Sequence, residues 1–99
     1  MKASCEAWLK EQFGDDRETI ETVYAEYVET MAGLAKELAA ARASGDPKTL
    51  DRVLHTIKGS AGMAGDAELS ELANKSRTAG NEAMLDEVAR MLADLTERN

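Results

Sequence analysis

A chain of 99 residues has room for one modest hydrophobic core and not for a second. Aromatic residues make up only 4% of it and proline occurs once, which favours helices over a β-sandwich or barrel. There are 12 Lys and Arg against 19 Asp and Glu, and the resulting net charge of −7 argues against nucleic acid or an anionic membrane surface as the main partner. The single cysteine, Cys5, excludes an intramolecular disulfide and a thiolate metal cluster. No apolar run reaches the roughly 18 residues of a membrane span, and the N-terminus lacks the apolar segment of a signal peptide, so we expect a soluble, cytoplasmic protein.

Glycine residues fall where helices are expected to end. Ser4 is predicted to cap a short helix that stops at Gly14. Asp15 and Asp16 are then predicted to open a long helix, with Glu18 placed for a capping box with Asp15. Gly33 interrupts this helix but not its apolar stripe, which continues for about seven turns. The stripe consists of Ile20, Val23, Tyr27, Met31, Leu34 and Leu38.

The clearest boundary is the run Ser44-Gly45-Asp46-Pro47. It combines a glycine stop, an aspartate N-cap and a proline at the first helical position. The helix that follows directs one apolar face toward a core, made of Leu50, Val53, Leu54, Ile57, Ala61 and Ala64.

Two further helices complete the pattern. Gly65 and Asp66 repeat the stop and cap, and the helix after them ends at Gly80 and Asn81. The core residues of that helix are expected to be Leu69, Leu72, Ala73 and Ser76, and those of the last helix Leu85, Val88, Leu92 and Leu95.

Short connections decide how these helices are arranged. Because each connection is only a few residues long, consecutive helices are expected to run antiparallel. The sequence therefore predicts an all-α fold, an antiparallel up-down four-helix bundle over residues 15–99. A short extra N-terminal helix, in residues 1–14, is expected to pack on the bundle through Trp8, Leu9 and Phe13.

His55 is the only histidine, and the periodicity places it outside the core. At about 100° per residue, it lies about 140° from the centre of the apolar face of its helix. A lone histidine is often a buried core residue with satisfied hydrogen bonds, but this position argues for an exposed imidazole.

The neighbours of His55 on the helix surface form an unusual set. Lys58 and Arg52 lie three residues to either side, and Lys48 lies two turns back on nearly the same line. Gly59 and Gly62 occupy the following turns of the same face, although each glycine costs a helix roughly 1 kcal/mol relative to alanine. Such bare positions let the backbone of another protein approach the imidazole.

An exposed neutral imidazole with cations beside it is suited to carrying a phosphoryl group. Its free ring nitrogen attacks phosphorus, and the phosphoramidate later releases the group. The added negative charge suits charge-assisted hydrogen bonds from Lys58 and Arg52. The chain has no glycine-rich nucleotide loop and no room for a nucleotide-binding domain, so the phosphoryl group must come from another protein.

The stretch from Leu54 to Gly65, LHTIKGSAGMAG, resembles the signature of histidine-containing phosphotransfer (HPt) domains. That signature is H-x-x-K-G with a further glycine ten residues after the histidine, and the resemblance extends over about residues 15–99. It departs at Leu54, where the family often has alanine, and at Asp66, where a small residue is common. These departures concern partner preference rather than the basic chemistry.

The resemblance implies a role for each matching residue. His55 would be phosphorylated, Lys58 would hold the phosphoryl oxygens, and Gly59 would leave space for the partner. The partners would be response-regulator receiver domains and a sensor or hybrid histidine kinase. A magnesium ion would belong to the receiver, so no cofactor is expected on this chain. Further partner-docking residues are expected at Arg52, Gly62 and Lys48.

The function expected from the sequence is that of a stand-alone phosphotransfer protein in a two-component phosphorelay, a monomeric carrier rather than an enzyme. The alternative is a helical interaction protein that binds and inhibits a receiver domain or sensor kinase without transfer. A zinc protein or a hydrolase is poorly supported, because one histidine without nearby ligands or a nucleophile builds neither site. Arg77 is a further candidate cation near the histidine.

Overall fold

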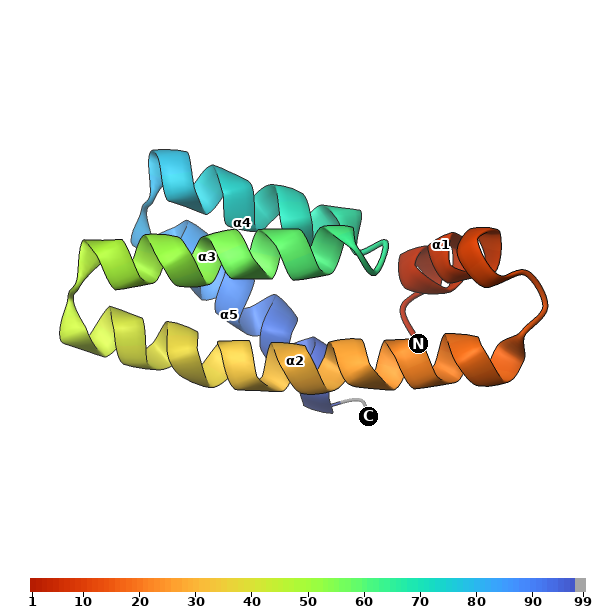
Figure 1. The fold of residues 1–99 in the computed structure, drawn as a ribbon. Coiled ribbons are helices and arrows are strands. Elements are labelled where there is room, and N and C mark those ends of the chain that lie inside the picture. Colours follow the sequence, from red (N-terminus) through yellow and green to blue (C-terminus); the bar gives the residue numbers. More distant parts are fainter. Residues whose placement is uncertain (98–99) are drawn as a thin grey trace.

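A computed structural model describes residues 1–97 of the chain, and all regular structure in this range is helical (Figure 1). The helices are α1 (Ala3–Phe13), α2 (Arg17–Ser44), α3 (Pro47–Gly62), α4 (Ala67–Ala79) and α5 (Glu82–Glu97). α2 packs against α3 and α5, and α4 packs against the same two helices. The predicted all-α, antiparallel up-down bundle is confirmed. None of the described helices is both long and apolar enough to cross a membrane.

The bundle core largely follows the predicted stripes, but Leu50 of α3 and Leu72 of α4 are only partly buried, and α2 and α5 also differ from the prediction. In α2, Val23 is only half-buried, whereas its neighbour Tyr24 is 4% exposed. Tyr24 is covered because the start of α1 lies on it, and the backbone N–H of Lys2 donates a hydrogen bond to the Tyr24 hydroxyl at 3.2 Å. α5 likewise buries Met91 in addition to the four predicted residues.

The starts of α1 and α2 agree only in part with the prediction. Asp16, one of the two aspartates predicted to open α2, is its N-cap, and its carboxylate accepts hydrogen bonds from the backbone N–H and the hydroxyl of Thr19. The predicted capping box between Asp15 and Glu18 is wrong, because Asp15 is not the N-cap. α1 begins at Ala3 and no side chain caps it, so Ser4 does not serve as its N-cap.

The boundary between α2 and α3 agrees with the prediction. Gly45 adopts a left-handed conformation, with φ of 71°, and closes α2. Asp46 accepts hydrogen bonds from the backbone N–H of Lys48 at 3.1 Å and the hydroxyl of Thr49 at 2.8 Å, and Pro47 begins α3. This cap fixes where α3 starts, and therefore the direction in which every later residue of α3 points.

The turn between α3 and α4 requires glycine at position 65. Asp66 N–H donates to the carbonyl of Ala61 at 2.9 Å and Gly65 N–H to that of Gly62 at 3.4 Å, which is the Schellman arrangement at a helix C-terminus. Gly65 has φ of 76°, and a Cβ there would overlap the Cβ of Trp8. The glycine thus serves both the turn and the close approach of α1.

α1 lies beyond the end of α3, over the N-terminal half of α2 (Figure 1), and a buried carboxylate ties it to the bundle. Asp66 is fully buried and accepts hydrogen bonds from Lys2 Nζ at 2.7 Å and from the Tyr27 hydroxyl at 2.8 Å. Burial, followed by the hydrogen bond to Asp66, raises the pKa of Tyr27 above its ordinary value. The carboxylate therefore joins three separate segments of the chain.

The apolar contacts of α1 only partly match the prediction. Cys5 and Leu9 are fully buried and Trp8 is partly buried against the core. Burial, and next the negative charge of Asp66, raises the pKa of Cys5 to about 11. Phe13 is 40% exposed and does not cover the bundle as expected. The helix contacts the bundle through its first two turns, and Phe13 lies one turn beyond them.

Candidate functional site

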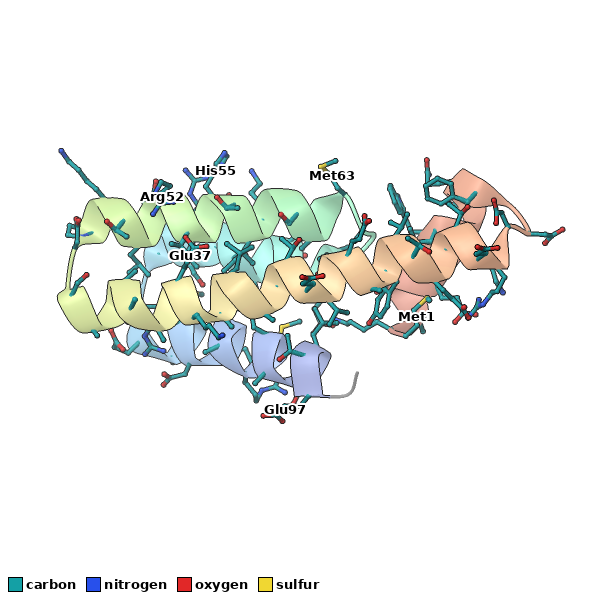
Figure 2. All side chains as sticks on the ribbon, turned by 60° about the horizontal axis from the view of Figure 1, so that its bottom comes forward. Met1, Glu37, Arg52, His55, Met63 and Glu97 are labelled. Atoms are coloured by element: carbon teal, nitrogen blue, oxygen red, sulfur yellow. The ribbon has the colours of Figure 1, made fainter. Side chains whose placement is uncertain are left out.

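His55 stands on the exposed face of α3, as its position in the helical pattern predicts. Val53, Leu54 and Ile57 are 2% exposed or less and hold α3 against the core, whereas His55 is exposed. Figure 2 shows it on the side of α3 that faces away from the bundle, with Arg52 on the same helix and Met63 directly after its last residue. The imidazole is therefore accessible to another molecule.

Arg77 of α4 contacts the imidazole directly. Its Nη1 lies 2.9 Å from Nδ1 of His55, and its Nε and Nη2 donate to the two carboxylate oxygens of Asp51 at 3.0 and 3.4 Å. Asp51 lies one turn before His55 on α3, and the hydrogen bond from Arg77 holds the pKa of this carboxyl below its ordinary value. A cation from a second helix thus bridges an acid and the histidine.

This contact was only partly predictable from the sequence. Arg77 follows Ser76, the last buried residue of α4, so it was a candidate cation at the edge of that helix. Asp51 was not singled out, although it lies at i−4 from His55 and so belongs on the same face. The helical pattern does not give the distance between α3 and α4, so it does not show that Arg77 reaches His55.

The other predicted cations differ in whether a carboxylate lies close to them. Lys58 is half-buried, and within residues 1–97 no carboxylate lies within 4 Å of its ammonium or of that of Lys48. Arg52 has a long contact, 3.9 Å from its Nη1 to Oε1 of Glu37. Lys48 lies in the first turn of α3, about 10 Å along the helix axis from His55. Within α3, Lys58 and Arg52 therefore lie closer to His55 along the helix than Lys48, which belongs to the edge of the site.

The two glycines of α3 are not required by the packing of the chain itself. Both are exposed; a Cβ on Gly59 would meet no atom within 4 Å, and a Cβ on Gly62 would lie 3.6 Å from the Ser70 hydroxyl, an ordinary contact. Since alanine would fit at both positions and favour the helix, the fold does not explain them.

A groove lies next to these glycines, between α1, α3 and α4. It has a volume of about 380 Å³, and its lining includes Lys58 and Gly62 of α3, Ser70 of α4 and Trp8 of α1. The Ser70 hydroxyl donates to the backbone carbonyl of Lys58 at 2.9 Å, which fixes α4 against α3 at this point. Met63, 78% exposed, follows the groove-lining Gly62 at the end of α3. The surface around His55 therefore combines cations, bare backbone and apolar side chains.

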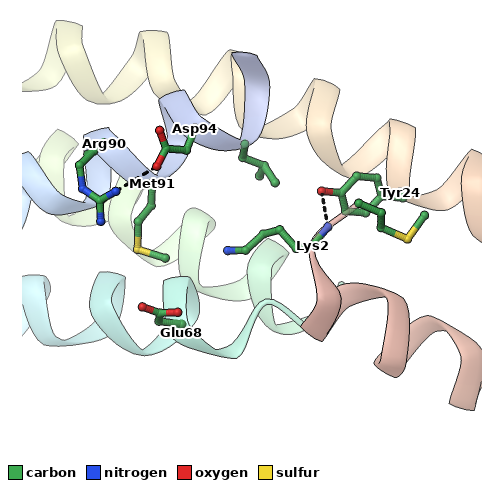
Figure 3. Close-up of a pocket in the computed structure, with 8 residues that line it drawn as sticks. Lys2, Tyr24, Glu68, Arg90, Met91 and Asp94 are labelled. Atoms are coloured by element: carbon green, nitrogen blue, oxygen red, sulfur yellow. Dashed lines mark hydrogen bonds and ion pairs between the residues drawn. The ribbon is translucent and has the colours of Figure 1, made fainter. Parts of the chain in front are cut away.

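A second hollow, of about 310 Å³, lies where the N-terminus meets α4 and α5 (Figure 3). Three of its charged residues form ion pairs: Lys2 pairs with Asp66, and Arg90 contacts Asp94 at 2.9 Å. In the part of the chain that the structure describes, no group of three or more histidine, cysteine or acidic side chains is placed to hold a metal ion.

The fold and this surface define a class of protein, a helical bundle that presents one accessible imidazole on its second bundle helix. The family model of the Hpt domain matches residues 22–98, and the chain belongs to this family. Domains of the family carry out histidine phosphotransfer in phosphorelays, interact with receiver domains and kinases, and are carrier modules rather than kinase domains. Comparisons with curated proteins and with solved structures found no significant match.

Proposed function

We propose that this chain acts as a stand-alone histidine phosphotransfer protein in a two-component phosphorelay. His55 accepts a phosphoryl group from a receiver-domain aspartate or a kinase and passes it to the receiver domain of a response regulator. The observation that supports this most directly is the exposed imidazole of His55, followed one turn along α3 by Lys58, whose ammonium has no carboxylate of residues 1–97 within 4 Å, and by the open backbone at Gly59. The chain works as a monomer in the cytoplasm.

The proposed transfer step is an in-line displacement at phosphorus. The lone pair of a neutral imidazole nitrogen attacks the phosphorus of an aspartyl phosphate, a P–N bond forms, the P–O bond breaks, and the aspartate leaves as a carboxylate. The remaining ring proton then passes to solvent. The reverse sequence delivers the phosphoryl group to the next aspartate, and His55 is regenerated.

Lys58 supports this step by charge. The phosphoryl group carries between about one and a half and two negative charges, and an ammonium one helical turn away stabilises it by charge-assisted hydrogen bonds. The magnesium ion needed at the aspartate belongs to the receiver domain, so this chain requires no cofactor of its own.

Docking depends on the surface around the histidine. The bare backbone at Gly59 and Gly62 allows a receiver domain to approach closely, and the charges of Arg52 and Lys48 complement the acidic phosphorylation pocket of a receiver. The short N-terminal helix, residues 1–14, is an accessory to the bundle at residues 15–99.

The test is transfer of a labelled phosphoryl group. When the protein is mixed with a phosphorylated receiver domain, we expect label on the wild type that is labile in acid and stable in alkali, and none on His55→Gln. Lys58→Ala should slow transfer or shorten the lifetime of the modified protein. Equal labelling of His55→Gln would disprove the assignment of the site. Binding of the receiver without any labelling would instead favour the inhibitory interaction protein.

A further inference from the structure

The contact between Arg77 and His55 determines where the ring proton lies. Arginine carries five N–H donors and no acceptor, so its Nη1, 2.9 Å from Nδ1 of His55, donates to that nitrogen. A nitrogen that accepts a hydrogen bond is unprotonated. In the neutral ring the single proton must therefore lie on Nε2.

Asp51 holds the guanidinium in place for this contact. Its two carboxylate oxygens accept hydrogen bonds from Nε and Nη2 of Arg77, which leaves Nη1 directed at the imidazole. A planar guanidinium bound at two points has little freedom to rotate. Because Asp51 and His55 are one turn apart on α3, the same helix presents both groups to the arginine of α4.

The geometry points to Arg77 as a positioning residue that caps Nδ1 of His55 and so controls its reactivity in both states of the carrier. In the resting protein the cap places the ring proton on Nε2, the nitrogen that no described group contacts. A protonated ring nitrogen has no in-plane lone pair for phosphorus. His55 therefore attacks only after Arg77 has released Nδ1, so that the proton can move there.

The same cap has the opposite consequence after phosphorylation, and this part rests on the proposed function. Once Nε2 bears the phosphoryl group, the neutral ring has a lone pair only on Nδ1, which matches the donor that Arg77 supplies. Protonation of Nδ1 makes the imidazole a better leaving group and promotes attack of water at phosphorus. Arg77 occupies the site of that proton, so it prolongs the life of the phosphohistidine.

Ring nitrogen NMR tests the first part on the free protein. Because His55 is the only histidine, labelling histidine with nitrogen-15 gives a single imidazole with no assignment problem. At alkaline pH, where imidazoles are neutral, we expect the wild type to carry its proton on Nε2. Arg77→Gln should shift the ratio of the two tautomers toward Nδ1–H roughly fivefold, the scale of one hydrogen bond from a charged donor at an exposed site.

Arg52→Gln is the matched control for this measurement. It removes the same charge at a residue three positions from His55 whose contact is with Glu37, not with the ring. We expect it to leave the tautomer ratio unchanged. The cap is disproved if Arg77→Gln keeps the wild-type ratio, or if Arg52→Gln alters it to the same extent. Circular dichroism of both variants checks that the bundle is intact.

The lifetime of the phosphorylated protein tests the second part. After the phosphoryl donor is removed at neutral pH, Arg77→Gln should lose label roughly fivefold faster than the wild type. Equal rates would overturn the protective role. If the wild type takes up no label on His55, the proposed function fails, while the tautomer ratios still decide the role of Arg77 in the free protein.

Discussion

Replacing Gly59 separates its role in the fold from its role at the docking surface. A Cβ at this position would meet no atom within 4 Å, so alanine enters without strain. It should stabilise the protein by about 0.5–1 kcal/mol through helix propensity, which corresponds to a rise in melting temperature of several degrees for a domain of this size.

Glutamate at the same position should behave differently. Its better propensity is offset by placing a negative charge in the last turns of α3, which costs about 0.3–1 kcal/mol, so stability should remain close to that of the wild type. Its side chain, however, projects from the bare surface beside His55. We expect phosphoryl transfer from a receiver domain to slow by about tenfold or more, because like charges at an interface oppose docking.

The assay pairs thermal unfolding with the initial rate of label transfer. Ala25→Glu is the matched control, because Ala25 is exposed on α2 beside Thr96 of α5, away from His55 on α3. This variant should transfer at the wild-type rate. If Gly59→Glu also transferred at the wild-type rate, the clearance argument would be refuted. A melting temperature lowered by Gly59→Ala would show instead that the fold requires this glycine.

Two further predictions concern the interior. Asp66→Ala should lower the free energy of unfolding by about 2–4 kcal/mol, because it leaves the buried Tyr27 hydroxyl without its partner. Asp66→Asn should lower it by only about 1 kcal/mol. Equal midpoints of urea unfolding for the wild type and the alanine variant would contradict this. The folded pKa of Cys5 is raised from 9.0 to about 11, so the folded state holds the thiol proton more tightly, and the stability gained below pH 9.0 is lost as the pH rises toward 11. Between about pH 8 and about pH 10 the wild type should therefore lose about 1 kcal/mol more stability than Cys5→Ala in urea titrations, and parallel declines would show that burial does not hold the thiol proton.

The end of α2, the start of α3 and the outward face of α3 were predictable from the sequence, although the caps of α1 and α2 were not fully so. The cap at Asp46 and Pro47 and the glycine stop at Gly45 involve only groups within a few residues of each other. Once α3 begins at Pro47, its periodicity alone turns His55 outward and Ile57 inward. Because helix ends and helical periodicity depend on residues that are close in the sequence, the bundle and the family signature could both be recognised from it.

Contacts between residues that are far apart in the sequence were decided by the tertiary structure. Arg77 meets His55 only because α4 packs along α3, which brings together residues 22 positions apart. Asp66 reads locally as a helix cap, yet its carboxylate is buried and bound by Lys2 and Tyr27, which come from the N-terminus and α2. Helical periodicity fixes the direction of a side chain about its own axis, but it does not fix the distance to the next helix. That distance is set by packing across the whole core, and it determines which nitrogen of the imidazole holds the proton.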